Sequence, residues 1–254
     1  MLNIVGLGLQ GLNSITIGGA DAIRSSDEVY LDSYTSVLQP DSLKEISEYF
    51  DRKIIPVERD FIEGPSPILD MCRTRNISLL VVGDGMSATT HKILEQNCAS
   101  SGVKVRVYEN ASILNVIPWR LGLYAYKMGP PVSLPFLSGS FFPTSVFSKI
   151  IRNHSNGMHT IVLLDLKSGQ TIDILQALEW LQEMEKRAGG DSILSKEEIC
   201  VASRVRQPGE KIIYGSIEKL KTMHFGSPSS IVIPSNPDTF EKENLAPFRA
   251  SNEN

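Results

Sequence analysis

The sequence lacks several features that would define a class of protein. Its three cysteines lie far apart and are odd in number, which excludes the disulfide framework of a secreted domain and fits a reducing compartment. The four histidines show no metal-ligand spacing and no cysteine pair accompanies them, so we predict no metal site. No apolar run reaches the roughly 18 residues of a membrane helix. The start, MLNIVGLGLQ, has no basic region and is not a signal peptide. We therefore expect a cytoplasmic protein that does not interact with a membrane.

Charge of one sign is not concentrated anywhere in the chain. The formal net charge is −4, and the lysines and arginines are scattered without a basic run, which argues against direct nucleic-acid binding. The G-x-S-x-G elbow of α/β-hydrolases and the Walker loop of nucleotide hydrolases do not occur either. The 254 residues, 41% hydrophobic and 21% charged, are typical of a globular protein with one large domain or two of medium size.

Short apolar strands alternate with helical segments in the first part of the chain. This alternation predicts an α/β domain with a mostly parallel sheet, which we place at residues 1–114. The expected strands are residues 2–5, 29–31, 53–57, 79–82 and 103–108. The expected helices are residues 16–24, 68–72, 91–99 and a segment that begins at residue 42.

Residues 127–143 are rich in glycine and proline and predict a connection into a second α/β domain, residues 115–254, with a mixed sheet. We expect helices at residues 144–151 and 172–186 and a strand at 160–166. The longer helix carries an apolar face of Leu175, Leu178, Leu181 and Met184. Strands at 199–205, 211–214 and 230–234 suggest a meander, and the polar residues from Pro237 onward suggest a surface tail.

A glycine motif follows the first strand. Gly6, Gly8 and Gly11 match G-x-G-x-x-G, and acidic residues follow at about the 20-residue distance of a dinucleotide-binding fold. A nicotinamide-dependent oxidoreductase is therefore one alternative. In that fold the helix begins within the glycine turn. Here the better helix starts are Ser14 and Thr16, which weakens this interpretation.

Polar residues follow two other expected strands. Asp84 lies between two glycines at the end of the strand in LLVVGDGMSATTH (residues 79–91), and Ser112 follows the strand that ends at Tyr108. Ligands of α/β proteins bind at the carboxyl ends of strands, so both residues are candidates for one pocket. Each could instead cap a helix. For His91, in the first turn of the next helix, we expect packing or capping.

A series of motifs recurs in a fixed order through most of the chain. They are MLNIVGLGL at the start, VYLDSYTSVL at 29–38, VVGDGMSATTH at 81–91, YENASILNVI at 108–117, SKIIRNHSNGMHTIVLLDLK at 148–167, CVASRV at 200–205 and FGSPSSIVIP at 225–234. This ordered set resembles the diphthine synthase family, whose members are S-adenosylmethionine-dependent methyltransferases with a tetrapyrrole-methylase-like fold.

The resemblance implies two α/β domains of the tetrapyrrole methylase type with the cofactor cleft between them. It implies methylation of the aminocarboxypropyl-modified histidine of translation elongation factor 2 in diphthamide biosynthesis, and a homodimer. It names no catalytic residue, because methyl transfer to a neutral amine needs mainly alignment and desolvation. Carried over by motif, the contacts with S-adenosylmethionine fall at Leu9, Asp84, Ser87, Ser112, Ile113, Leu164, Val205 and Ser230.

The chain departs from the family pattern at two of these places. Gly85, Met86 and Ser87 stand where the family has Pro-Phe-Gly, and Ser230 stands where it has a histidine. A second alternative is therefore a divergent member that binds cofactor or partner without transferring a methyl group. The sequence leaves open how many methyl groups are added and whether the carboxylate is esterified.

Overall fold

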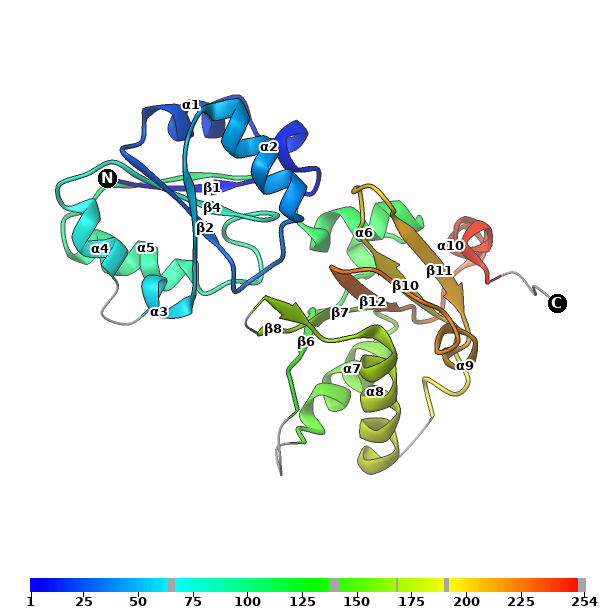
Figure 1. Cartoon of the computed structure of the whole chain (residues 1–254). Helices are drawn as coiled ribbons and strands as arrows, with labels where there is room; N and C mark the ends of the chain where they lie inside the picture. The colour runs from blue at the N-terminus through cyan, green and yellow to red at the C-terminus, as the bar shows by residue number, and fades with distance from the viewer. Residues whose placement is uncertain (64–66, 138–141, 168, 190–191, 251–254) are drawn as a thin grey trace. The chain divides into compact units, whose positions relative to one another are not determined.

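The computed structural model describes residues 1–63, 67–137, 142–167, 169–189 and 192–250. The chain divides into two compact units, Met1–Ile113 and Leu114–Asn254, and each has its own sheet and core (Figure 1).

The first unit is built on a five-stranded sheet in the order β3-β2-β4-β1-β5, and every pairing in it is parallel. The predicted parallel α/β architecture is therefore confirmed. The central strand β1 pairs with β4 and β5 on its two sides, with Leu2 opposite both Ile77 and Val105. The strands are β1 (Leu2–Gly6), β2 (Glu28–Asp32), β3 (Ile54–Val57), β4 (Ile77–Val81) and β5 (Val105–Tyr108).

Helices cover both faces of this sheet, as Figure 1 shows. On one face α1 (Ile17–Ser25) and α2 (Pro40–Phe50) contribute to an apolar core with Ile23 and Ile46. The other face has a second core beneath α3 (Arg59–Ile62), α4 (Pro67–Cys72) and α5 (His91–Ser100). Because both faces are covered, the inner strands β1 and β4 are buried along their whole length, whereas the edge strand β5 alternates valine with Arg106 and is not fully buried.

The second unit contains a mixed sheet in the order β11-β10-β12-β7-β6. Only β6 and β7 pair in parallel among these strands. The predicted meander is wrong, because β10 lies between β11 and β12 and the chain returns across it after β11. The strands are β6 (Val132–Leu134), β7 (Thr160–Leu164), β10 (Ile199–Ser203), β11 (Lys211–Gly215) and β12 (Ser229–Ile233), and a short hairpin joins β8 (Leu166–Lys167) and β9 (Gln170–Thr171).

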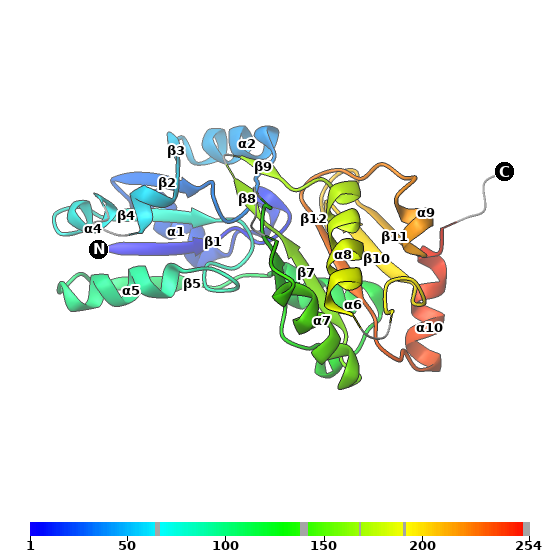
Figure 2. The ribbon, with the colours of Figure 1, turned by 90° about the horizontal axis from the view of Figure 1, so that it is seen from below.

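Two helices, α7 (Ser145–Ser155) and α8 (Ile174–Ala188), lie side by side over the core of this unit (Figure 2). The predicted apolar face of α8 is partly wrong: Leu175 is 43% exposed, and Ile174 is buried in its place. Asp173 caps the helix by accepting a hydrogen bond from Leu175 N, which fixes the start and turns position 174 to the core. The remaining helices are α6 (Ile113–Leu121), η2 (Ala125–Lys127), α9 (Ile217–Leu220), α10 (Thr239–Leu245) and η3 (Ala246–Phe248).

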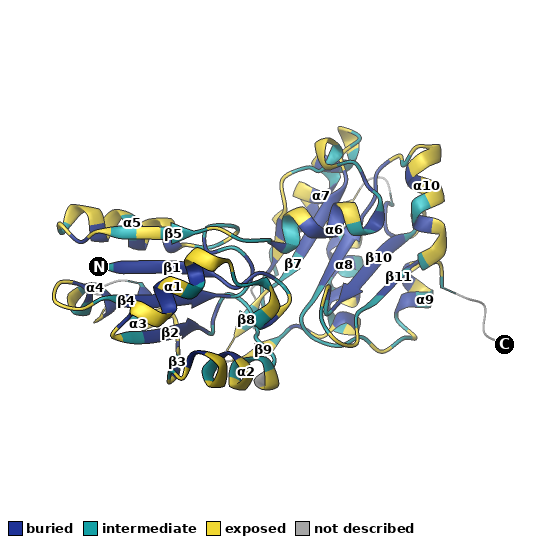
Figure 3. Ribbon diagram, turned by 90° about the horizontal axis from the view of Figure 1, so that it is seen from above, coloured by how far each residue is buried: buried dark blue, intermediate teal, exposed yellow. Residues whose placement is uncertain are grey.

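Over residues 238–250 the predicted surface tail is wrong, and residues 251–254 lie outside the described residues. Asp238 and Glu241 form a capping box that starts α10, and Glu241 and Leu245 are completely buried. The helix therefore packs against its unit through one side, while its outer side is exposed (Figure 3). Although the composition of this segment is polar, it contains a completely buried carboxylate, that of Glu241.

The carboxylate of Glu241 is surrounded by donors. Its Oε1 accepts from Tyr124 N at 3.0 Å and lies 2.9 Å from His159 Nε2, and Lys127 Nζ donates to its Oε2. Burial opposes its ionisation, but these donors outweigh burial and lower the pKa of Glu241 to about 2. Ser235 N donates to Nδ1 of His159, and burial lowers the pKa of His159. The ring is therefore neutral, and its Nε2–H donates a hydrogen bond to Glu241.

In the described ranges, no helix is both long and apolar enough to cross a membrane.

Candidate functional site

Five of the predicted site residues follow three strands that are neighbours in the first sheet. Since β4, β1 and β5 are adjacent and parallel, the loops at their carboxyl ends meet at one edge of the sheet. These residues are Leu9 after β1, Asp84 and Ser87 after β4, and Ser112 and Ile113 after β5. We call this place the β4-β1-β5 edge.

A pair of backbone hydrogen bonds holds the first two loops together. Gly8 N donates to Gly83 O, and Gly83 N donates to Gly8 O, both at 2.9 Å. Both glycines have positive φ, +64° and +82°, a conformation that other residues rarely adopt. This bridge brings the segment of Leu9 next to the segment of Asp84.

Asp84 organises the loop of residues 83–87, which we call the Asp84 loop. Its Oδ1 accepts from Met86 N at 3.0 Å and from Ser87 Oγ at 2.8 Å, and its Oδ2 accepts from Asn110 N at 3.0 Å. Burial opposes ionisation of Asp84, but these hydrogen bonds outweigh it and hold its pKa below the ordinary value. The capping alternative is wrong, because α5 begins at His91 with Thr90 as its N-cap residue.

Asn110 joins all three loops, and the sequence analysis missed this role. Its Nδ2 donates to Gly6 O and to Ser14 O, each at 2.8 Å, while its Oδ1 accepts from Ala111 N at 2.8 Å. With its backbone N–H on Asp84, this one residue touches the ends of β1, β4 and β5. Its place at a strand end, two residues before Ser112, was the available clue.

Ser112 and Ile113 lie at the start of α6. Ser112 is buried, and Ile113 is the first residue of the helix. The first N–H groups of a helix have no partner inside it and favour polar or anionic groups nearby. The start of α6 therefore lies at the β4-β1-β5 edge.

The glycine motif serves packing between loops. The α-helix after β1 does not begin in the glycine turn: a 3₁₀ turn, η1 (Gly11–Ser14), intervenes, and α1 starts at Ile17 with Thr16 as its cap. A Cβ at Gly6 would lie 2.9 Å from Gly83 O, and one at Gly8 would lie 2.8 Å from Asn110 Oδ1. The helix terminus that a pyrophosphate needs is therefore not placed at the motif, contrary to the oxidoreductase alternative.

The other three predicted residues share one edge of the second sheet. Leu164 ends β7, Val205 follows β10, and Ser230 lies near the start of β12, opposite both Leu163 and Ala202. Since β12 runs antiparallel to its neighbours, its start lies beside their ends. The structure thus gathers the predicted residues into two groups, one in each unit.

The β4-β1-β5 edge combines an ionised carboxylate, hydroxyl groups and the start of a helix with partly exposed apolar side chains at Leu9, Met86 and Ile113. This combination suits a small ligand with polar and apolar parts. Across the part of the chain that is described, no three histidine, cysteine, aspartate or glutamate residues are grouped to hold a metal ion.

Comparisons with known proteins agree with this geometry. The family model of the tetrapyrrole (corrin/porphyrin) methylases matches residues 1–221. The chain is 47% identical over 251 residues to diphthine synthase of Thermoplasma acidophilum, covering 99% of this chain and 96% of that protein. It is 33% identical over 272 residues to the human diphthine methyl ester synthase, covering 98% of this chain and 95% of that protein.

Solved structures give the same result. A crystal structure of a diphthine synthase superimposes with a TM-score of 0.87 at 29% identity and covers 98% of this chain and 95% of that one. A protein of Entamoeba histolytica, named as a candidate diphthine synthase, has a TM-score of 0.87 at 36% identity, with 99% of both chains covered.

Proposed function

Because the chain belongs to the tetrapyrrole methylase family and to its diphthine synthase branch, we propose that the β4-β1-β5 edge binds S-adenosylmethionine. The chain is a methyltransferase of diphthamide biosynthesis, as the sequence resemblance predicted. The observation that carries this conclusion is the 47% identity with a diphthine synthase over nearly the full length of both chains.

The residues of the edge fit this cofactor. Oδ2 of Asp84 accepts a hydrogen bond from Asn110 N at 3.0 Å, and a carboxylate oxygen can accept more than one, so it could also accept from a ligand hydroxyl or amine. Leu9 and Ile113 are partly exposed and offer apolar contacts of the kind an adenine ring needs. We propose Leu9, Asp84, Ser87, Ser112 and Ile113 as cofactor contacts in the first unit.

Leu164, Val205 and Ser230 remain proposed contacts in the second unit. Their support is the common edge on which the strands place them. Leu163, the neighbour of Leu164, pairs directly with Ser230, so this serine lies beside the end of β7.

The chemistry asks little of the protein besides binding and alignment. When bound, S-adenosylmethionine supplies a methyl group from a sulfonium centre. Asp84 would fix a polar group of the ligand, and the apolar side chains would exclude water from the reacting atoms. We assign no catalytic base, since a neutral amine attacks without one.

The methyl acceptor that we propose is translation elongation factor 2, through the aminocarboxypropyl arm on its modified histidine. Support comes from the chain's place among proteins named for diphthine, the product of that modification. We further propose a homodimer and a cytoplasmic location. The three cysteines are free and buried, which accords with a reducing compartment.

Binding at Asp84 is tested by calorimetry with S-adenosylmethionine. We expect Asp84→Asn to weaken the affinity by roughly 10- to 100-fold, because hydrogen bonds to a charged group contribute about 1.5–3 kcal/mol. Asp60→Asn, at an exposed position of α3, is the matched control and should bind like the wild type. An unchanged affinity in folded Asp84→Asn removes Asp84 from the site.

The same titration separates the two remaining alternatives. A divergent binder would take up the cofactor but transfer no methyl group to a competent acceptor. An oxidoreductase would bind nicotinamide dinucleotide and not S-adenosylmethionine, a result that the position of η1 between the glycine motif and α1 argues against.

A further inference from the structure

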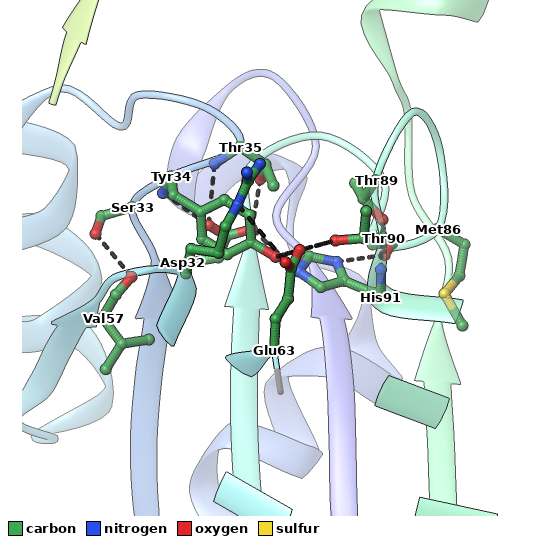
Figure 4. A network of polar contacts seen from close by, with 12 residues as sticks. Asp32, Ser33, Tyr34, Thr35, Val57, Glu63, Met86, Thr89, Thr90 and His91 are labelled. Atoms are coloured by element: carbon green, nitrogen blue, oxygen red, sulfur yellow. Dashed lines mark hydrogen bonds and ion pairs between the residues drawn. The ribbon is translucent and has the colours of Figure 1, made fainter. Parts of the chain in front are cut away.

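His91 occupies a position that neither packing nor capping explains. Its side chain is completely buried at the carboxyl ends of the strands of the first unit (Figure 4). Nδ1 lies 2.9 Å from Gly85 O, and Nε2 lies 3.2 Å from Oδ2 of Asp32, which is also completely buried. The ring therefore stands between the end of β2 and the Asp84 loop.

The main-chain neighbour of the ring fixes one of its hydrogen bonds. A carbonyl oxygen can only accept, so Nδ1–H donates to Gly85 O. Nε2 faces the carboxylate of Asp32 at 3.2 Å, a contact between two completely buried side chains.

Asp32 is itself held firmly. Its Oδ1 accepts from Tyr34 N at 2.8 Å and from Thr35 N at 3.1 Å, and the hydroxyl of Thr35 donates to its Oδ2. These bonds fold the chain back just after β2 and fix the carboxylate to a strand of the sheet. The ring of His91 is therefore anchored on a rigid element rather than on a loop.

A second layer of polar groups covers the pair. The ring of Tyr34 meets the imidazole edge-on, with centroids 6.2 Å apart, and its hydroxyl donates to Glu63 Oε1 at 3.2 Å. Thr90 donates to the same oxygen (Figure 4), and the guanidinium of Arg59 lies 5.1 Å from the centroid of the Tyr34 ring. These groups surround the His91–Asp32 contact.

We propose that His91 is a positioning residue that holds the Asp84 loop in its binding conformation by donating a hydrogen bond from Nδ1 to Gly85 O. The proposal rests on the proposed function, since its consequence is cofactor affinity. Gly85 lies between Asp84 and Met86, whose N–H donates to Asp84. A shift of the Gly85 carbonyl would therefore displace the hydrogen bonds that orient the Asp84 carboxylate.

Burial alone does not account for this arrangement. Burying the polar imidazole costs free energy that an apolar side chain of similar size would avoid. The imidazole also contacts a main-chain oxygen of the loop, where an apolar side chain could not donate. The hydrogen bond from His91 therefore holds the main chain of the loop at Gly85.

Two substitutions separate the two ends of the link. In His91→Asn the amide nitrogen takes the place of Nδ1 and keeps a donor for Gly85 O. In His91→Gln the amide nitrogen takes the place of Nε2 and keeps a donor for Asp32 only. His159→Gln in the second unit is the matched control, since it makes the same change at another buried histidine: it keeps a donor for the Glu241 carboxylate and loses the contact of Nδ1 with Ser235 N at 2.9 Å.

Three quantities are measured on each purified full chain: the melting temperature, the dissociation constant for S-adenosylmethionine, and amide hydrogen exchange over residues 82–90 without cofactor. We expect His91→Gln to exchange faster there and to bind about tenfold more weakly, the loss of roughly one hydrogen bond. His91→Asn should keep its protection and bind within about threefold of wild type. His159→Gln should lower the melting temperature alone.

Exchange and affinity equal to wild type in folded His91→Gln would overturn the proposal. If His91→Gln does not fold, His91→Asn decides: a protected loop supports the link to Gly85, and an unprotected loop contradicts it. If the wild type itself binds no S-adenosylmethionine, the proposed function fails, whereas the exchange of the free protein still shows whether His91 holds the loop.

Discussion

Replacement of Asn110 by aspartate should break the junction of the three loops with almost no change in shape. The Nδ2 group donates to Gly6 O and Ser14 O at 2.8 Å, and Asn110→Asp puts an acceptor in its place. Each lost bond is worth about 1 kcal/mol, and a carbonyl left without a donor costs about 1–3 kcal/mol. We therefore expect the free energy of unfolding to fall by roughly 2–4 kcal/mol.

Thermal unfolding with and without S-adenosylmethionine is the assay. A loss of this size lowers the melting temperature by at least about 4 °C, and the stabilisation by cofactor should shrink as well because the Asp84 loop loses its neighbour. Since only a protonated carboxyl can donate to these carbonyls, the new carboxyl has a raised pKa in the folded state, and the deficit should narrow as the pH falls.

The matched control is Asn97→Asp, the same change on the exposed side of α5 in the same unit. If Asn110→Asp melts like this control and gains as much from the cofactor as wild type does, the three-loop junction contributes nothing, and our account of the edge is refuted.

Two further predictions follow from contacts elsewhere in the chain. The pKa of Glu241 is about 2 in the folded protein against an ordinary 4.5, so its contribution of about 3 kcal/mol is present above pH 4.5 and is lost as the pH falls toward 2. Acid titration of stability should show this loss in wild type and not in Glu241→Gln; identical slopes would contradict it. For Gly85→Ala, a Cβ would lie 2.7 Å from Cγ2 of Ile4, so the loop must move. We expect the free energy of unfolding to fall by about 1–3 kcal/mol, with a lower melting temperature and weaker cofactor binding. An unchanged affinity would show that cofactor binding does not depend on the position of this loop.

The first unit could be predicted well from sequence because its local patterns are strong. The run Leu79–Val81 makes β4 recognisable as a buried strand, and Thr16 marks the start of α1 because its side chain caps that helix. The second unit was harder. Strand order depends on contacts between distant segments, so the antiparallel strands looked like a meander although β10 lies in the middle.

The C-terminal helix shows a different limit. Polar residues are expected at the surface, but Glu241 is completely buried because Lys127, His159 and Tyr124 N meet its carboxylate. These partners are more than 80 residues away in the sequence, as the 82-residue separation from His159 illustrates. No local pattern reveals such a group.

For the site, strand-end positions identified Asp84 and Ser112, and the family resemblance supplied the others. The sequence did not indicate that Asp84 serves the loop as well as a ligand, nor that Asn110 joins the loops. It also gave His91 an ordinary packing role, because its link to Asp32 crosses 59 positions of the chain and only the fold brings the two together.

The most direct test is incubation of the purified chain with labelled S-adenosylmethionine and an elongation factor 2 that carries the unmethylated aminocarboxypropyl-histidine. We predict mass gains in methyl steps at that histidine, which would also count the methyl groups transferred. Absence of both transfer and cofactor binding under these conditions would contradict the assignment of this chain as a methyltransferase.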